Sequence, residues 1–256
     1  MLKDYDAFCE RESLNPENSA NEFILEMITH GKAVATQNQA INAIKFYWEH
    51  ILGKPKSRIE IDRPMKTKPL PSVLSLEEVN KIFAAIENSK HLLIIKTIYG
   101  CGLRIGELCS LRIEDIDGKG MRIHIRQGKG RKDRFVPLPE DLLKSLRTYY
   151  KEYRPKEFLF EGQPEKGKED TPRMYSTTSI RAILNRAIKK AGIRKRVKVH
   201  TLRHSYATHL YEHGVNLRSI QVLLGHSSSK TTEIYTRVSK QHLDKLPSPL
   251  DFLKNE

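Results

Sequence analysis

The densest group of chemically versatile side chains is the stretch HTLRHSYATHL, residues 200–210. His200 and His204 are four residues apart and would share one face of a helix, a spacing that can bind zinc. A zinc hydrolase would also place an acid there as general base. The charged residue between them is instead Arg203, and a cation beside a metal dication is unfavourable. Arginine suits a phosphodiester, because its planar guanidinium donates two parallel hydrogen bonds to phosphate oxygens. We therefore interpret the stretch as a phosphate site with an adjacent histidine, and expect no metal.

The charge of the whole chain favours a polyanionic partner. Its 256 residues include 45 Lys and Arg against 31 Asp and Glu, a formal net charge of +14. Nucleic acid and an anionic membrane surface are the two candidates. No run of about 18 apolar residues occurs, and the first residues, MLKDYDAFCERES, lack a signal-peptide pattern. We expect nucleic acid as the partner, no membrane, and a cytoplasmic, nucleoid-associated protein.

The number and spacing of the three cysteines are consistent with the reducing environment of the cytoplasm. Cys9, Cys101 and Cys109 are odd in number, widely spaced and without C-x-x-C pairing. They fit a reducing environment and are expected to be buried as small hydrophobic residues.

The elements that must position these residues fall into two predicted domains joined by a linker. Residues 1–53 are expected to form a small helical domain, with apolar stripes over 18–52 that end at Gly53. Residues 54–74 hold four prolines among basic residues and are interpreted as an extended linker. This linker could follow a phosphate backbone or be a solvated tether. The phosphate-backbone alternative makes candidate DNA contacts of Lys54, Lys56, Arg58, Lys66 and Lys68.

The larger domain, residues 75–256, is predicted to be mainly helical with a small antiparallel sheet, an α+β fold. Ser75 and Glu78 have capping-box spacing before an apolar run. Further helices are expected over 91–99, 105–111, 141–153 and 179–191. Between them, MRIHIRQ and RFVPLP alternate like strands around the turn GKGRKD, which predicts a hairpin with basic residues at its tip.

Four ordered motifs now reveal a family resemblance. GCGLRIGEL, GKGRKDR, HTLRHSYATHL and LLGHSSSKTTEIYT follow one another between about Ser75 and Tyr235. Together they resemble the tyrosine recombinases. The segment ATQNQAINAIKFYWEHILGK also resembles the amino-terminal core-binding domain of the Xer and integron integrase branch. The stretch before it is short, so that domain is expected to be a shortened, SAM-like DNA-binding domain.

The resemblance implies a site-specific recombinase that cleaves and rejoins double-stranded DNA through a 3′-phosphotyrosine, without metal, ATP or other cofactor. Tyr235 would be the nucleophile and His200 its proton acceptor. Arg104 and Arg203 would neutralise the charge that develops on the phosphate, and His226 would add a hydrogen bond to the same oxygens. An alkoxide leaving group needs a proton, which Lys129 in the hairpin turn would supply as general acid. The catalytic set is therefore Arg104, Lys129, His200, Arg203, His226 and Tyr235.

Each assignment has a structural alternative. Arg104 could form a surface salt bridge to Glu107, and His226 could be a neighbour of a helix C-cap. Lys129 shares its turn with Arg131, Lys132 and Arg134, which are further candidates for phosphate contact. His204, His209 and His213 are expected to be packing or capping residues. Tyr235 could belong to the core, as could Tyr149, Tyr150, Tyr206 or Tyr211.

The resemblance also implies an assembly, a homotetramer on two DNA sites that is monomeric when free, with any accessory protein unidentified. The tail from about residue 239 carries an apolar set that could pack into a neighbouring protomer or onto its own domain: Leu243, Leu246, Leu250, Phe252 and Leu253. A type IB topoisomerase and a non-catalytic DNA-binding protein are the alternative functions. The small helical domain and the tail favour the recombinase over the topoisomerase, and the full catalytic set disfavours the non-catalytic protein.

Overall fold

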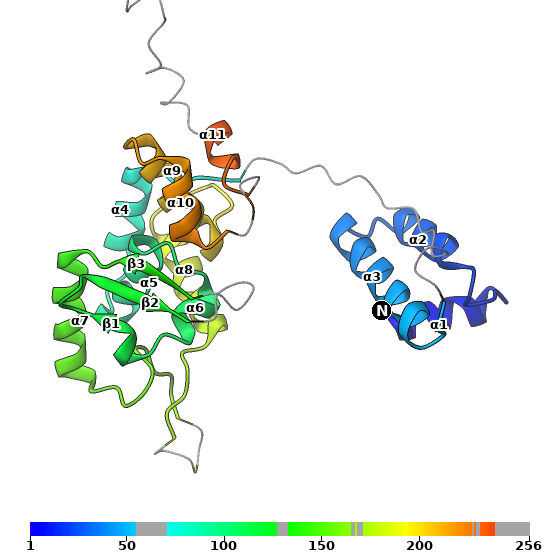
Figure 1. Cartoon of the computed structure of the whole chain (residues 1–256), viewed down its shortest axis with the longest axis horizontal. Coiled ribbons are helices and arrows are strands. Elements are labelled where there is room, and N and C mark those ends of the chain that lie inside the picture. The colour runs from blue at the N-terminus through cyan, green and yellow to red at the C-terminus, as the bar shows by residue number, and fades with distance from the viewer. Residues whose placement is uncertain are drawn as a thin grey trace, which may run out of the picture. The chain divides into compact units, whose positions relative to one another are not determined.

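The structure is a computed structural model that describes residues 1–54, 71–126, 133–164, 167, 171–226, 228 and 231–238. The chain divides into two compact units, Met1–Pro69 and Leu70–Glu256, whose elements are labelled in Figure 1. Most of the predicted linker, residues 54–74, falls outside the described residues. Within the described residues, no helix has the length and apolar character needed to cross a membrane.

Residues 1–54 of the first unit form three helices: α1 (Leu2–Arg11), α2 (Ala20–Thr29) and α3 (Val34–His50). Their apolar faces form one core that includes Tyr5, Phe23 and Trp48. The Tyr5 hydroxyl and the Trp48 indole nitrogen both donate to the Pro16 carbonyl, at 2.6 and 3.0 Å, which fixes the loop between α1 and α2. The sequence pattern did not indicate α1. Its apolar residues are few, and its burial depends on α2 and α3.

The second unit is mainly helical with one small antiparallel sheet, which confirms the predicted fold class (Figure 1). Strands β1 (Ile116–Asp117), β2 (Arg122–Ile125) and β3 (Arg134–Pro137) pair in chain order, and Ile123 lies opposite Val136. The β2–β3 hairpin is as predicted, although residues 127–132 of its turn lie outside the described part. The helices are α4 (Leu76–Ala84), α5 (Ser89–Gly100), α6 (Ile105–Cys109), α7 (Glu140–Tyr153), α8 (Thr177–Lys190), α9 (Val199–Glu212), α10 (Leu217–Leu224) and α11 (Ile234–Val238), with a short 3-10 turn at Ile113–Asp115.

Local sequence explains where several of these elements begin. Ser75 and Glu78 form the predicted capping box at the start of α4, with each side chain bonded to the other residue's backbone nitrogen. Asn88 and Asn216 cap α5 and α10 by accepting from backbone nitrogens three residues on. Of these three helices, α5 and α10 pack against α9.

Helix α5 occupies the centre of the main core. Its residues Ile94, Ile95 and Ile98 are fully buried, and it contacts α7, α8 and α9. The inner face of the sheet adds Ile123 and Val136 to the same core, while Phe135 on the opposite face is half exposed. All three cysteines are free thiols and buried, as the sequence analysis expected.

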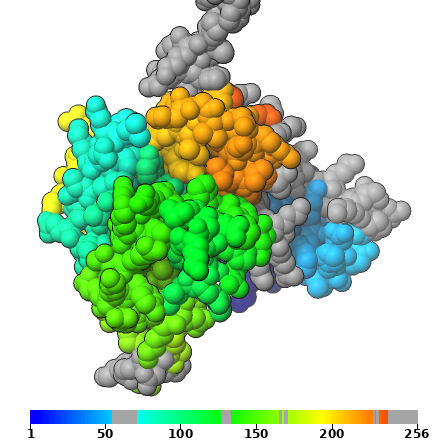
Figure 2. Space-filling model, turned by 60° about the vertical axis from the view of Figure 1, so that its left-hand side comes forward, coloured from blue at the N-terminus to red at the C-terminus, as the bar shows by residue number. Residues whose placement is uncertain are grey.

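A smaller core joins the last three helices. It consists of Ala207 from α9, Ile220 and Leu224 from α10, and Tyr235 from α11. Figure 2 shows the orange surface of α9 and α10 directly against the green surface of the sheet-bearing middle of the chain. This small core therefore brings Tyr235 to the same helix that carries His200 and Arg203.

Candidate active site

Arg203 is the most deeply buried charged residue of the site. Its side chain is fully buried, and its guanidinium donates to the carbonyls of Gly102, at 2.6 Å, and Leu224. Its Nε has no partner among the described residues. Burial, with the charge of Arg104 beside it, lowers the pKa of Arg203 to about 10, so the group remains charged at neutral pH. A buried guanidinium that keeps an unused N–H donor can bind an anion.

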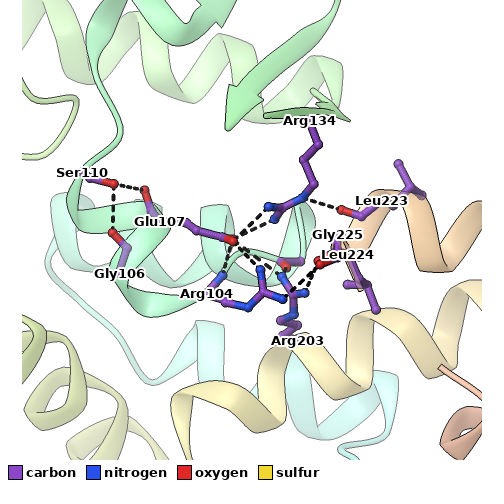
Figure 3. Close-up of polar contacts among 10 residues, drawn as sticks. Arg104, Gly106, Glu107, Ser110, Arg134, Arg203, Leu223, Leu224 and Gly225 are labelled. Atoms are coloured by element: carbon purple, nitrogen blue, oxygen red, sulfur yellow. Dashed lines mark hydrogen bonds and ion pairs between the residues drawn. The ribbon is translucent and has the colours of Figure 1, made fainter. Parts of the chain in front are cut away.

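Glu107 on α6 gathers three guanidinium groups around one carboxylate (Figure 3). Arg104 donates to it at 2.6 Å, Arg134 makes two bonds at 2.9 and 2.7 Å, and Arg203 lies 3.6 Å away. Burial opposes ionisation of Glu107, but bonds from Arg134 and Arg104 outweigh it and lower its pKa to about 2. The single Glu107 carboxylate thus holds three guanidinium groups close together. The pairing of Arg104 with Glu107, considered above as an alternative to catalysis, is part of the site itself.

Arg134 occupies a different environment from the one the sequence analysis expected. A contact with the DNA backbone was expected, but the side chain is 7% exposed and its Nε donates to the Leu223 carbonyl at 2.8 Å. Arg134 therefore ties the first residue of β3 to α6 and to the end of α10. A guanidinium fork can make these three bonds at once, whereas a lysine could not.

Two glycines in left-handed conformation let the backbone approach these arginines. Gly102 has φ +60°, and a Cβ there would lie 2.5 Å from the Tyr206 ring. Gly225, the C-cap of α10, also has φ +60°, and a Cβ there would lie 3.0 Å from the Arg134 side chain. The Gly225 carbonyl accepts from Arg104 at 3.4 Å. Glycine is required at both positions by backbone angle and by space.

Tyr235 is 1% exposed, and its hydroxyl lies 3.2 Å from Nδ1 of His204. Its ring stacks on His226 with an interplanar angle of 16° and a centroid distance of 6.5 Å. Burial raises the pKa of Tyr235 to about 12, against the opposing charges of Arg203 and Arg104. Ionising it fully at neutral pH would cost on the order of 7 kcal/mol. Nucleophilic attack therefore requires transfer of the phenol proton to a neighbour.

Three histidines lie in the site, and two of them, His204 and His226, contact the Tyr235 ring. The rings of His200 and His204 meet edge to face at 4.5 Å, and His226 Nδ1 lies 3.0 Å from the Thr232 hydroxyl. Burial and nearby arginines lower the pKa of His200, and they lower that of His226 to about 3. Burial, with His200 as neighbour, lowers the pKa of His204 to about 4. All three histidines are therefore neutral at physiological pH.

This histidine cluster predicts an acid sensitivity of the fold. A folded-state pKa below the unfolded value means that the unfolded chain takes up protons first as pH falls through about 6.5. Stability should therefore decline from that pH downward. In urea unfolding between about pH 7 and pH 5, we expect His226→Phe to show a weaker pH dependence than the wild type. His213→Phe, at the C-cap of α9, is the control. Equal pH dependence in the wild type and His226→Phe would contradict the prediction.

The structure brings together five of the six predicted catalytic residues: Arg104, His200, Arg203, His226 and Tyr235. The sixth, Lys129, lies outside the described residues, as do the apolar tail and these candidate DNA contacts: Lys56, Arg58, Lys66, Lys68, Arg131 and Lys132. Lys54 is described. Its ammonium donates to the Glu17 carbonyl at 2.7 Å and lies 4.9 Å from the Trp48 ring centroid.

Sequence reasoning did not identify two members of the site, Glu107 and His204. Glu107 was considered only as a surface partner of Arg104, and His204 as a packing residue. His204 instead contacts the phenol hydroxyl, a role that the sequence analysis gave to His200. The order H-x-x-R-H already placed His204 one turn from His200, which is the signal that could have indicated it. No cluster of metal-ligating side chains occurs in the described part of the chain.

Comparisons with known proteins find similarity to the tyrosine recombinases. The phage integrase family matches residues 72–242. Tyrosine recombinase XerA of Pyrococcus furiosus is 37% identical over 239 residues, which cover 92% of this chain and 81% of the relative. XerA of Thermococcus onnurineus is 37% identical over 235 residues, covering 89% of this chain and 79% of the relative.

Solved structures of similar fold belong to the same group. A crystal structure of XerA recombinase aligns with a TM-score of 0.60 at 29% identity, covering 95% of this chain and 89% of that chain. XerH recombinase, in a post-cleavage complex with its palindromic difH substrate, aligns with a TM-score of 0.71 at 27% identity. That alignment covers 92% of this chain and 72% of XerH.

Proposed function

Because the chain belongs to the phage integrase family as a tyrosine-type site-specific recombinase, we propose that it cleaves and rejoins double-stranded DNA through a 3′-phosphotyrosine on Tyr235. The observation that carries this proposal is the meeting of Tyr235 with two histidines and with the charges of Arg104 and Arg203. Relatives solved on DNA, such as XerH on difH, support DNA as the substrate.

The arginines supply the electrostatic part of the reaction. Attack on phosphorus adds negative charge to the non-bridging oxygens, which Arg104 and Arg203 neutralise. If the Thr232 hydroxyl donates to Nδ1 of His226, the ring proton is on Nε2 and can be donated to the same oxygens. Glu107 keeps the guanidiniums in place before DNA arrives, so little reorganisation is needed during the reaction.

The remaining steps move two protons. A histidine of α9 accepts the phenol proton as the bond from Tyr235 to phosphorus forms. Lys129 donates a proton to the departing 5′-oxygen. Ile125 at the end of β2 pairs with Arg134 at the start of β3, and Arg134 joins the arginine cluster, which supports a role for the residues between these strands. One phosphodiester replaces another, so rejoining requires no ATP.

The proposed electrostatics predict cleavage in excess EDTA, because two arginines and a lysine provide the positive charge that a divalent ion would otherwise supply. The assay is covalent capture of random genomic fragments in EDTA, with sequencing of the trapped ends to identify the DNA site. Two-site recombination and supercoil relaxation are then compared on that site. Strict dependence on an added divalent ion would contradict metal-independent cleavage, and relaxation without recombination would indicate a topoisomerase.

The general-acid role predicts that Lys129→Ala cleaves ordinary DNA slowly, by a factor of about 10² or more. The same variant should recover most of its rate on DNA whose bridging 5′-oxygen is replaced by sulfur, because a thiolate leaves without a proton. Lys132→Ala, in the same turn, is the control and should show no such difference between substrates. Sulfur rescue in the Lys132 variant in place of the Lys129 variant would move the general acid to Lys132.

We extend the proposal to the assembly. Each Tyr235 forms a bond to one strand, so exchange between two duplexes, each cut on both strands, requires four protomers. The free protein is proposed to be a monomer that assembles on DNA, and its location to be the nucleoid. Light scattering with and without a captured DNA site tests both stoichiometries.

A further inference from the structure

His204 contacts the reacting atom of the proposed nucleophile. Its Nδ1 lies 3.2 Å from the Tyr235 hydroxyl, and the two rings are tilted at 55° with centroids 5.8 Å apart. His200, the expected proton acceptor, makes its ring contact with His204. The phenol is buried, so the first atom able to receive its proton is a protein atom, not bulk water.

We propose that His204 is the catalytic base that receives the phenol proton of Tyr235, with His200 packed behind it. This inference rests on the proposed function and identifies which histidine of α9 performs the transfer. In the step, the bond from the Tyr235 oxygen to phosphorus forms and the bond from phosphorus to O5′ breaks. The phenol proton moves to Nδ1 of His204, and Lys129 gives a proton to O5′. Rejoining reverses each transfer.

The surroundings of His204 support a neutral base in the resting site. The titratable and charged groups that face it are His200 and Arg203 on α9, Tyr235 on α11 and His226 after α10. Burial, with His200 and Arg203 as neighbours, lowers the pKa of His204, so the resting imidazole is neutral at neutral pH and has one ring nitrogen able to accept a proton. A bound phosphate brings negative charge to the same arginines, which makes the imidazolium easier to form during attack.

The test separates proton transfer from positioning. The amide of His204→Asn can still hydrogen-bond the phenol from the position of Nδ1, but it cannot take a proton. We measure single-turnover adduct formation on a nicked duplex that carries a captured DNA site. The variants are His204→Asn, His204→Phe and His200→Asn, and His213→Asn on the same helix is the control.

We expect His204→Asn to bind DNA like the wild type and to form adduct about 100-fold or more slowly near pH 7. Its rate should then rise about tenfold per pH unit up to about pH 9, because hydroxide replaces the lost base, while the wild-type rate stays flat. Near-wild-type rates in His204→Asn, a slow rate with a flat pH profile, or a steep profile in His200→Asn alone would each overturn the proposal.

A second variant covers the case in which asparagine disturbs folding. His204→Ala should form adduct as slowly as His204→Asn. Added imidazole should accelerate adduct formation by His204→Ala at least about tenfold and leave the rate of His200→Ala unchanged. A folded His204→Ala whose rate imidazole does not raise would count against the proposal. Tyr235→Phe is measured beside these variants. Adduct formation by Tyr235→Phe refutes the proposed function, whereas a normal rate in His204→Asn with no adduct in Tyr235→Phe refutes only the assignment of the base.

Discussion

Tyr235→Phe is expected to bind DNA as tightly as the wild-type enzyme and to form no covalent adduct with it. The substitution removes one hydroxyl, and DNA affinity depends mainly on phosphate contacts by the basic residues of the chain. The ring remains to fill its place among Ala207, Ile220 and Leu224, so folding should change little. The phenol oxygen is the atom that would bond to phosphorus, and phenylalanine has no substitute for it.

Gel shift and denaturing electrophoresis on one labelled duplex make both measurements together. Tyr206→Phe is the matched control, because Tyr206 packs in the same small core and is not assigned to the reaction. A band from Tyr235→Phe that survives denaturation would place the nucleophile elsewhere.

Glu107→Gln is expected to destabilise the fold by about 3–5 kcal/mol and to slow cleavage strongly. The carboxylate is 8% exposed and is shared by Arg104, Arg134 and Arg203, so a neutral amide leaves buried guanidiniums without a counter-charge. The amide nitrogen would also face donors where the carboxylate oxygen accepts bonds. Arg104 and Arg203 would then repel each other without the group that aligns them.

Urea unfolding and single-turnover cleavage measure the two effects. Glu114→Gln is the control, because Glu114 is 60% exposed and pairs with Arg126 at the surface, so its loss should cost no more than about 1 kcal/mol. Equal destabilisation by Glu107→Gln and Glu114→Gln would show that the arginine cluster does not depend on Glu107.

Local features of the fold could be predicted from the sequence because they depend on neighbouring residues. The capping box at Ser75 and Glu78 and the hairpin that pairs Ile123 with Val136 are both specified within a few positions. Helix α1 could not be predicted in this way, since its stability comes from packing against α2 and α3. Ile28 and Phe46 lie within the segment 18–52 that was predicted to carry apolar stripes, but they are 47% and 61% exposed, because the buried face of each helix is narrower than its set of apolar residues.

The residues of the site were also predictable from the sequence only in part. The family resemblance of the four motifs indicated Arg104, Arg203 and Tyr235, which lie close together in the structure. The role of Glu107 could not be read from spacing, because its partners Arg134 and Arg203 reach it only through the tertiary fold. In the sequence, Arg134 belongs to the same basic motif as Arg131 and Lys132, yet β3 directs it inward to Glu107 and the Leu223 carbonyl. His204 gains its contact with Tyr235 from the packing of α11 on α9.

The most direct test of the central claim is to map the covalent bond itself. Wild-type protein is trapped on a nicked duplex carrying a captured DNA site in EDTA, digested with protease and nuclease, and analysed by mass spectrometry. The account predicts one nucleotide joined through its 3′-phosphate to the peptide that contains Tyr235. A nucleotide on any other residue, or one joined through a 5′-phosphate, would contradict it.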